Sequence, residues 1–266
     1  MKLFLSLVLT VAASMPSAIA GLTYDFSSST TGMAAQTIAG NVKAEGKSIR
    51  IDIATGDGML FENGSFVVSS NGGQTMSVVN PKAKTFYELD MAQLTGGADT
   101  LLKQFGGTLK FDVRNPKVTV TGGGDSDLIE GFQTKKSRVD SAYEIAVDGL
   151  GSPMVIRMQL ATDVWWTDKV SSDFTNFLQM RGFRTGVEAV DKLIATEAGA
   201  IKGFPMKQIT TTKVNLNGNE MTTTSTSTVK NVRKVAIPAA TFAVPAGLTK
   251  TASPLERMMG KLGGGK

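Results

Sequence analysis

The sequence contains no cysteine and no histidine among its 266 residues. Without cysteine no disulfide can form, so the fold must be held together by its hydrophobic core, which a chain of this size can supply. The missing histidine excludes Ser-His-Asp and Cys-His nucleophile systems, histidine general bases and histidine or thiolate metal sites. Any chemistry would therefore depend on carboxylates, lysine, tyrosine or metals bound by oxygen ligands.

Long apolar runs are also missing, except near the start of the chain. Residues 3–13 are apolar but too short to span a bilayer. They follow Lys2 and precede Ala18-Ile19-Ala20, a pattern typical of a cleavable signal peptide. We expect residues 1–20 to be removed, with the mature protein periplasmic or secreted. No cysteine follows the cleavage site, so no lipid anchor is expected, and no later stretch predicts a transmembrane helix.

The formal net charge is +5, and the basic residues are dispersed along the chain. The densest cluster is Lys135-Lys136-Ser137-Arg138. A nucleic-acid-binding protein usually concentrates basic residues on one face, interleaved with aromatic residues. We interpret the cluster as part of a solvated face and predict no nucleic-acid partner.

Residues 41–89 show the clearest pattern of the chain. Apolar residues such as Val42, Ala44, Ile49 and Ile51 alternate with polar residues, which indicates strands with one buried face. Turn signals separate the runs. They are Gly46-Lys47, Gly56-Asp57-Gly58, Asn63-Gly64, Asn71-Gly72-Gly73 and Asn80-Pro81. The stretch predicts a meander of antiparallel strands.

The rest of the chain is predicted to be mainly β, with two helical sections. A first strand occupies residues 21–29 and a polar loop residues 27–31, and a loop is expected over 122–130. Further strands are expected at residues 108–121, 129–135, 142–147 and 154–161, and a threonine-rich hairpin at 206–216 and 221–235. Helices are expected at residues 90–106, opened by Asp90, and 171–199, where Thr185-Gly186-Val187-Glu188 forms a capping box.

Three short motifs suggest sites but fit turns better. Gly40, Gly46, Lys47 and Ser48 resemble a phosphate-binding loop, but the spacing is wrong and a strand follows. Asn63-Gly64-Ser65 matches a glycosylation sequon that the turn already explains. Asp125, Asp127 and Glu130 do not match a calcium loop and are interpreted as a solvated turn. No metal or cofactor is predicted.

Paired carboxylates are the remaining route to catalysis, as in glycosidases. Glu45, Asp52, Glu62 and Glu88 are available, but acidic residues are common on solvated strands and no supporting motif accompanies them. We assign no catalytic residue and predict that the protein is not an enzyme.

Both tryptophans are adjacent, as Trp165 and Trp166. Neighbouring residues of a strand face opposite ways, so one ring should be core and the other exposed or facing a cavity; alternatively, both pack. The thirteen methionines are scattered, which favours a plastic apolar interior over a copper site. The predicted ligand-contacting residues are Trp165, Trp166, Met154, Met158, Phe174 and Phe177.

Six segments together resemble an exported bacterial family catalogued as domain of unknown function 4412. In order they are 46–52, 79–87, 129–132, 165–168, 203–207 and 242–247, beginning with Gly46-Lys47-Ser48-Ile49-Arg50-Ile51-Asp52 and ending with Phe242-Ala243-Val244-Pro245-Ala246-Gly247. In architecture this family is similar to the LolA and LolB type of lipoprotein carriers and receptors.

The resemblance implies a mainly β (α+β) fold: a curved antiparallel sheet, or half-barrel, with helices plugging its concave side. Residues 21–250 would form this single domain, followed by a flexible tail at 251–266. An apolar cavity between sheet and plug would bind a lipid-like ligand, which makes a non-enzymatic periplasmic carrier the leading hypothesis. The alternative is a structural or interaction module of the cell envelope, with an envelope protein as partner.

Overall fold

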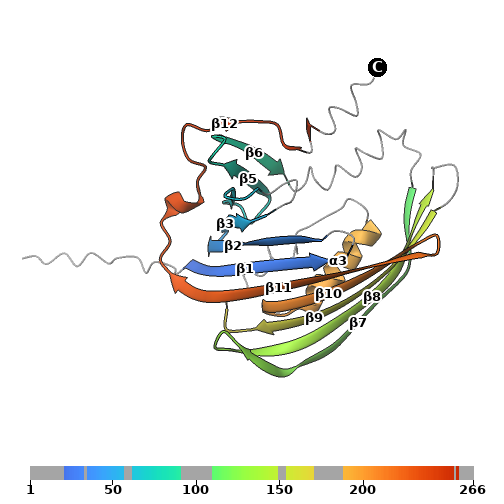
Figure 1. Ribbon diagram of the computed structural model, residues 1–266. Helices are drawn as coiled ribbons and strands as arrows, with labels where there is room; N and C mark the ends of the chain where they lie inside the picture. The colour runs from blue at the N-terminus through green and yellow to red at the C-terminus, as the bar shows by residue number, and fades with distance from the viewer. Residues whose placement is uncertain are drawn as a thin grey trace, which may run out of the picture.

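The computed structural model describes residues 21–32, 35–56, 62–90, 110–148, 154–170, 188–254 and 256–257. Within these ranges the protein is mainly β: twelve strands form a single open sheet, accompanied by one α-helix and one short 3₁₀ helix. The sheet is visibly curved (Figure 1). The prediction of a mainly β fold built on one curved sheet is therefore confirmed.

The elements follow one another mostly as antiparallel neighbours. The strands of the first half are β1 (Gly21–Thr31), β2 (Gln36–Glu45), β3 (Ser48–Thr55), β4 (Phe66–Ser69), β5 (Thr75–Asn80) and β6 (Thr85–Asp90). The second half contains β7 (Lys110–Ile129), β8 (Phe132–Asp148), β9 (Met154–Thr167), α3 (Glu188–Ala200), β10 (Phe204–Leu216), β11 (Asn219–Val235), η2 (Ala239–Phe242) and β12 (Thr249–Lys250).

The strand order brings the first strand and a late strand together at the middle of the sheet. It runs β12-β6-β5-β4-β3-β2-β1-β11-β10-β9-β8-β7, so β7 is an edge strand and β1 pairs with β11. Gly21 lies opposite Val235 and Thr31 opposite Thr224 in that pairing. Figure 1 shows the blue strand β1 beside the orange strand β11. This single pairing makes one sheet out of two meanders.

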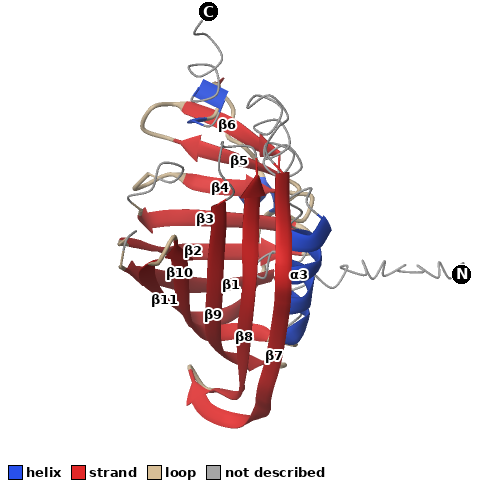
Figure 2. Cartoon of the chain, turned by 90° about the vertical axis from the view of Figure 1, so that its right-hand side faces the viewer, coloured by secondary structure: helices blue, strands red, loops and turns tan. Residues whose placement is uncertain are grey.

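Alternation along the strands gives the sheet two chemically different faces. On β9 the even-numbered side chains from Met154 to Trp166 share one face, and the odd-numbered ones from Arg157 to Trp165 share the other. Helix α3 contacts β7 and β8 on the even face, because Ile201 at its C-terminal end packs on Val164 and Trp166. Figure 2 shows α3 on one side of the sheet, beside β7 and β8. We call the side bearing Trp166 the helix face and the other the outer face.

The largest buried cluster lies on the helix face at the β1–β11 junction. Tyr24 and Phe204 are its largest members, and their rings meet edge to face with centroids 5.3 Å apart. Leu22, Val42, Ala44, Ile49, Val170, Met206 and Val229 complete the buried set. The cluster draws on both meanders, so it stabilises the pairing that joins them.

The predicted turns that fall in the described residues are present. Gly46 (φ 56°), Gly64 (φ 79°), Gly72 (φ 74°) and Gly218 (φ 90°) all have the positive φ that glycine tolerates best. Gly46 and Lys47 join β2 to β3, so the likeness to a phosphate-binding loop was correctly set aside. The turn at 56–58 and the strand at 59–61 lie largely outside the described residues.

Three strand boundaries were predicted wrongly. The polar loop at 27–31 is the second half of β1, where serine and threonine hydroxyls face β11, as in the 2.9 Å contact between Ser27 Oγ and Thr228 Oγ1. The loop at 122–130 is the end of β7, which stays paired with β8 through bulges near Gly122 and Gly124. The single strand at 129–135 contains the β7–β8 turn, at Glu130 and Gly131.

The helical predictions are only partly tested. Helix α3 confirms the end of the section predicted at 171–199, with Leu193 and Ala198 buried. Residues 171–187, including Phe174, Phe177 and most of the capping box, lie outside the described part. So do residues 91–106 of the first predicted helix. Asp90, expected to open that helix, is the last residue of β6 and pairs with Thr75.

The C-terminal segment covers the β6 edge of the sheet. β12 pairs in parallel with β6, and the backbone N–H of Thr251 donates to the carbonyl of Phe86 at 2.8 Å. Val244 and Leu248 pack on the small cluster of Phe66, Val68 and Val79. The segment therefore shields an edge that would otherwise offer unpaired backbone groups.

Candidate functional site on the helix face

The two tryptophans point to opposite faces and both are buried, with exposed fractions of 8% for Trp165 and 7% for Trp166. Trp166 packs on Val164 and Ile201, and its indole N–H donates to Ser137 Oγ at 3.0 Å. The opposite orientation follows the predicted alternation. The expectation that one of the rings is exposed is not met, and the burial agrees with the alternative in which both rings pack.

Trp165 is covered on the outer face by charged side chains. Its indole N–H donates to Asp127 Oδ2 at 3.0 Å. The amines of Lys136 and Lys207 lie 4.4 and 4.8 Å from the ring centroid, within the range of cation–π attraction. Lysine stems thus shield this ring, and Trp165 does not share a face with Met154, Met158 and Trp166.

Met154 and Met158 lie on the helix face together with Trp166, and both are half-buried. Met158 lies opposite Tyr143 on β8 and Val214 on β10, and Val214 lies opposite Met221 on β11. A second row beside it joins Ile145, Ile156 and Leu216 across β8, β9 and β10. We call these seven residues, Tyr143, Met158, Val214, Met221, Ile145, Ile156 and Leu216, the apolar rows.

The apolar rows differ from the buried core in their degree of burial. Each member is half-buried, and none belongs to the clusters of fully buried residues. Side chains of this kind on adjacent strands form a continuous apolar surface beside α3. Such a surface with few polar groups is typical of sites that bind apolar ligands.

Two polar groups accompany the apolar rows. Oε1 of Glu197, on α3, is buried and has no hydrogen-bond partner among the described residues. Burial, and secondly the charge of Glu197, raise the pKa of Tyr143. A buried carboxylate oxygen without a partner is rare and costly in folded proteins. Glu197 Oε1 and the Tyr143 hydroxyl are therefore two polar groups next to the apolar rows.

A cavity of about 260 Å³ lies further along the sheet, near the β1–β11 junction. Its lining includes Tyr24, Phe26, Ser28, Met206, Gln208 and Ser227, which belong to the helix face. The apolar floor with hydroxyl and amide groups at its side matches the usual composition of a small-molecule pocket. Burial raises the pKa of Tyr24, whose hydroxyl stays neutral there.

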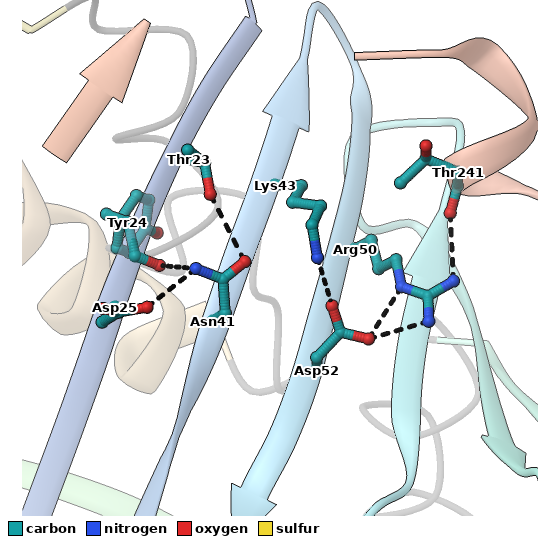
Figure 3. Close-up of polar contacts among 8 residues, drawn as sticks. All are labelled: Thr23, Tyr24, Asp25, Asn41, Lys43, Arg50, Asp52 and Thr241. Carbon is teal, nitrogen blue, oxygen red and sulfur yellow. Dashed lines mark hydrogen bonds and ion pairs between the residues drawn. The ribbon is translucent and has the colours of Figure 1, made fainter. Parts of the chain in front are cut away.

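The outer face of β1–β3 carries a polar network that fixes its carboxylates (Figure 3). Asn41 donates to Tyr24 O at 3.1 Å and to Asp25 Oδ1 at 2.8 Å. Hydrogen bonds from Asn231 and then Asn41 lower the pKa of Asp25. Asp52 accepts from Lys43 Nζ at 2.6 Å and from Arg50 Nε at 2.8 Å.

Glu62 and Glu88, two further carboxylates considered for hydrolysis, are similarly engaged. Glu62 accepts from Asn80 Nδ2 at 2.7 Å, and Glu88 accepts from Lys250 Nζ at 2.6 Å. Asp52, Glu62 and Glu88 each have a different partner, and these contacts form no shared pair of carboxylates. The described residues also contain no group of three or more acidic side chains placed to hold a metal ion.

Asp127 and Glu130, two acidic residues of the segment that was considered as a calcium loop, bind different partners. Asp127 accepts from Trp165, whereas Glu130 Oε2 accepts from the backbone N–H of Asn231 at 3.0 Å. They therefore anchor the end of this hairpin to β9 and β11.

In the part of the chain that the structure describes, no helix is long and apolar enough to span a membrane.

The sequence matches the family described as domain of unknown function (DUF4412) over residues 28–248. The chain belongs to this family. The matched range includes every strand from β2 to β11 and ends just before β12. The resemblance read from the short segments between Gly46 and Gly247 is thereby confirmed. No curated protein matches the DUF4412 chain.

Solved structures provide distant likenesses. An uncharacterized conserved protein from Thermus thermophilus has a TM-score of 0.36 at 10% identity, covering 88% of this chain and 90% of the other. A LolA superfamily protein from Nitrosomonas europaea has a TM-score of 0.32 at 10% identity, covering 85% and 91%. PNGF-II has a TM-score of 0.34 at 10% identity, covering 90% of this chain and 32% of its own.

Sequence reasoning found part of the helix face and missed the rest. It named Met154, Met158 and Trp166, which the structure places on one face, and Trp165, which it places on the other. It missed Tyr143 and Glu197. Tyr143 shares one face of the strand predicted at 142–147 with Ile145 and Val147, which was a usable signal. Nothing in the sequence indicated that Glu197 would lie beside it.

Proposed function

We propose that this DUF4412 protein is an exported, non-enzymatic binding or carrier protein for a lipid-like or other apolar ligand. The observation that carries the proposal is the pair of half-buried apolar rows beside α3. The curved sheet would act as a half-barrel, with α3 among the helices that cover its concave side. The ligand would lie on the helix face, in contact with Met154, Met158 and Trp166.

Export is part of the proposal. Gly21, the residue that follows the predicted cleavage site, is the first described residue of β1, so cleavage after Ala20 would keep all twelve described strands. The mass of the protein recovered from the periplasm or medium tests this directly. We expect a mature chain starting at Gly21; a full-length chain found only in the cytoplasm would contradict export.

The ligand is tested by purifying the exported protein gently, extracting it with organic solvent and weighing the extract by mass spectrometry. We expect a stoichiometric apolar molecule. The matched variants are Met158→Glu and Gln159→Glu, which place the same charge on adjacent residues of β9 that face opposite sides. Burying a carboxylate against the apolar rows opposes binding of an apolar molecule, so Met158→Glu should lose the molecule and Gln159→Glu should keep it.

Circular dichroism and the thermal midpoint establish that both variants are folded. An empty extract from the native protein, together with no uptake of apolar dyes, would contradict the proposal. If Met158→Glu retained the apolar molecule as well as the native protein does, the ligand would not lie on the helix face.

An envelope interaction module is the second candidate, and one observation favours it. The edge strand β7 exposes two large apolar side chains, Val120 at 49% and Leu128 at 68%. Exposed edges of sheets pair with added strands of partner proteins. If this candidate is right, Val120→Lys with Leu128→Lys should abolish recovery of a partner from envelope extract, while the solvent extract of the protein stays empty.

A further inference from the structure

A second hollow, of about 400 Å³, lies on the outer face between β7 and β10. Ala142 on β8 and Ala161 on β9 contribute only methyl groups to its floor. Longer side chains of neighbouring strands surround them, so the small residues account for the depression. The hollow lies on the face opposite α3 and is separate from the apolar rows.

The rim of this hollow is set by one cross-strand row. Lys117 lies opposite Ala142, Ala142 opposite Gln159, and Gln159 opposite Lys213. Three strand spacings separate the two lysines, a distance of about 14 Å between their backbones. Their flexible side chains can both reach toward the alanine floor. The row therefore places one ammonium group on each side of the hollow.

The basic residues that line the hollow differ in whether a carboxylate lies beside them. Arg138 is engaged by Asp140, with Nε 2.9 Å from Oδ2, and by Asp163, with Nη1 3.6 Å from Oδ1. Lys213 Nζ lies 3.2 Å from Glu220 Oε1, an exposed pair of the kind that contributes little. Among the described residues Lys117 has no carboxylate partner. Asp140 is the one carboxylate of the lining, and Arg138 already occupies it.

Neutral donors complete the surroundings. The hydroxyls of Thr119 and Thr211 and the amide of Gln159 also line the hollow. Ammonium groups together with hydroxyls and amides are the groups that hold phosphate, sulfate or carboxylate oxygens through charge-assisted hydrogen bonds.

We propose that this hollow binds an anionic ligand that carries at least two phosphate, sulfate or carboxylate groups, held between Lys117 and Lys213. Two separated lysines favour a ligand with two charged groups over a single small ion. The alanine floor admits the body of the ligand between them. This site is independent of the proposed apolar ligand, because its side chains lie on the other face of the sheet.

The test measures binding of two probes at low and at moderate salt. A heparin-derived octasaccharide represents a free polyanion, and vesicles of phosphatidylglycerol, compared with phosphatidylcholine, represent anionic headgroups. We expect one probe to bind, more weakly at the higher salt concentration, since salt screens exposed charges. If only the oligosaccharide binds, the anionic groups belong to a free ligand. If only the anionic vesicles bind, they belong to a lipid headgroup.

Three variants distinguish a site from general surface charge. The double variant Lys117→Gln/Lys213→Gln should bind roughly tenfold more weakly or worse, because charge-assisted hydrogen bonds are lost. The control Lys47→Gln/Lys82→Gln removes the same charge from exposed turns of the other meander and should bind as the native protein does. Ala161→Val keeps all charges but fills the floor, and should also weaken binding.

Equal weakening in both double variants would overturn the proposal, as would binding of neither probe. Met158→Glu provides the remaining control. It should leave anion binding unchanged whether or not the apolar ligand exists, so the two proposals fail independently.

Discussion

At the scale of single residues, Gly40 shows how closely β2 and β3 approach. A Cβ placed on Gly40 would collide with the carbonyl oxygen of Asp52 and come within 3.0 Å of the Phe26 ring. The register of β2 and β3 shifts at this point. No L side chain fits there without moving the backbone, so glycine is required by close approach and not by its φ angle.

We therefore predict that Gly40→Ala lowers the free energy of unfolding by several kcal/mol, on the order of the cost of overpacking. Gly124→Ala is the matched control, because its Cβ would meet nothing within 4 Å and its φ is not positive. Urea unfolding followed by circular dichroism measures both. Equal midpoints for the two variants would show that the β2–β3 approach is looser than the structure indicates.

The protein's three tyrosines are a second feature at this scale. Burial raises the pKa of Tyr24 and of Tyr143, and burial followed by the charge of Glu62 raises the pKa of Tyr87 to about 12. The ordinary value is 10.0. In each case the folded-state pKa exceeds the unfolded one. The resulting stabilisation is complete below pH 10 and is lost as the pH rises toward 12 and beyond.

A spectrophotometric titration tests this prediction. We expect all three tyrosines to titrate near pH 10 in concentrated urea and at higher pH in the folded protein. Alkaline unfolding should accompany ionisation of Tyr24. A tyrosine that titrates at the same pH in the folded protein and in urea would contradict its burial.

At the scale of elements, the C-terminal segment has a definite role as the cover of β6. Lys250 Nζ lies 2.6 Å from Glu88 Oε2, and Arg50 Nη1 donates to the carbonyl of Thr241 at 3.4 Å. The Arg50 guanidinium also lies 3.7 Å from the centroid of the Phe66 ring. These contacts attach β12 to β6 and η2 to β3.

Ending the chain after Ala243 should therefore destabilise the first meander and promote association through the exposed β6 edge. It removes Val244 and Leu248 from the cluster around Phe66 as well as the β12 pairing. Thermal unfolding and light scattering measure the two effects. Lys250→Gln is the control: it removes only an exposed ion pair and should change the free energy of unfolding by less than about 1 kcal/mol.

The strand ends were predicted correctly where the turn depends only on the residues within it. The turns at Gly46, Gly64, Gly72 and Gly218 were predicted correctly, because glycine tolerates the positive φ that these turns require. The prediction was wrong at residues 122–130, where a glycine-rich, acidic composition indicated a loop. Pairing with β8 overrides that composition, and the bulges accommodate the glycines within the strand.

At the scale of the whole molecule, the β1–β11 pairing joins two meanders into one sheet. Tyr24 on β1 contacts Phe204 on β10, so the main core also crosses this boundary. Both tryptophans are on β9, far from the N-terminal strands in the sheet order. The two halves should consequently unfold together and not as separate units.

Tyr24→Ala tests this coupling. It should lower the free energy of unfolding by about 3 to 5 kcal/mol, the usual cost of truncating a buried aromatic residue. The shift should appear equally in circular dichroism and in tryptophan fluorescence, although the substitution lies in the other meander. Fluorescence that keeps the native midpoint would show that the meanders unfold independently.

The sequence by itself determined the mainly β class, most strand positions, the turns and the chemistries that cannot occur without cysteine and histidine. These properties depend on residue type and on spacing over a few neighbours, which the chain carries locally. Only the tertiary structure decided which strands are neighbours. That choice placed Met158 beside Tyr143 and Val214, and Lys117 in one row with Lys213. Rows of this kind depend on the register between strands that are distant in sequence, which alternation alone does not specify.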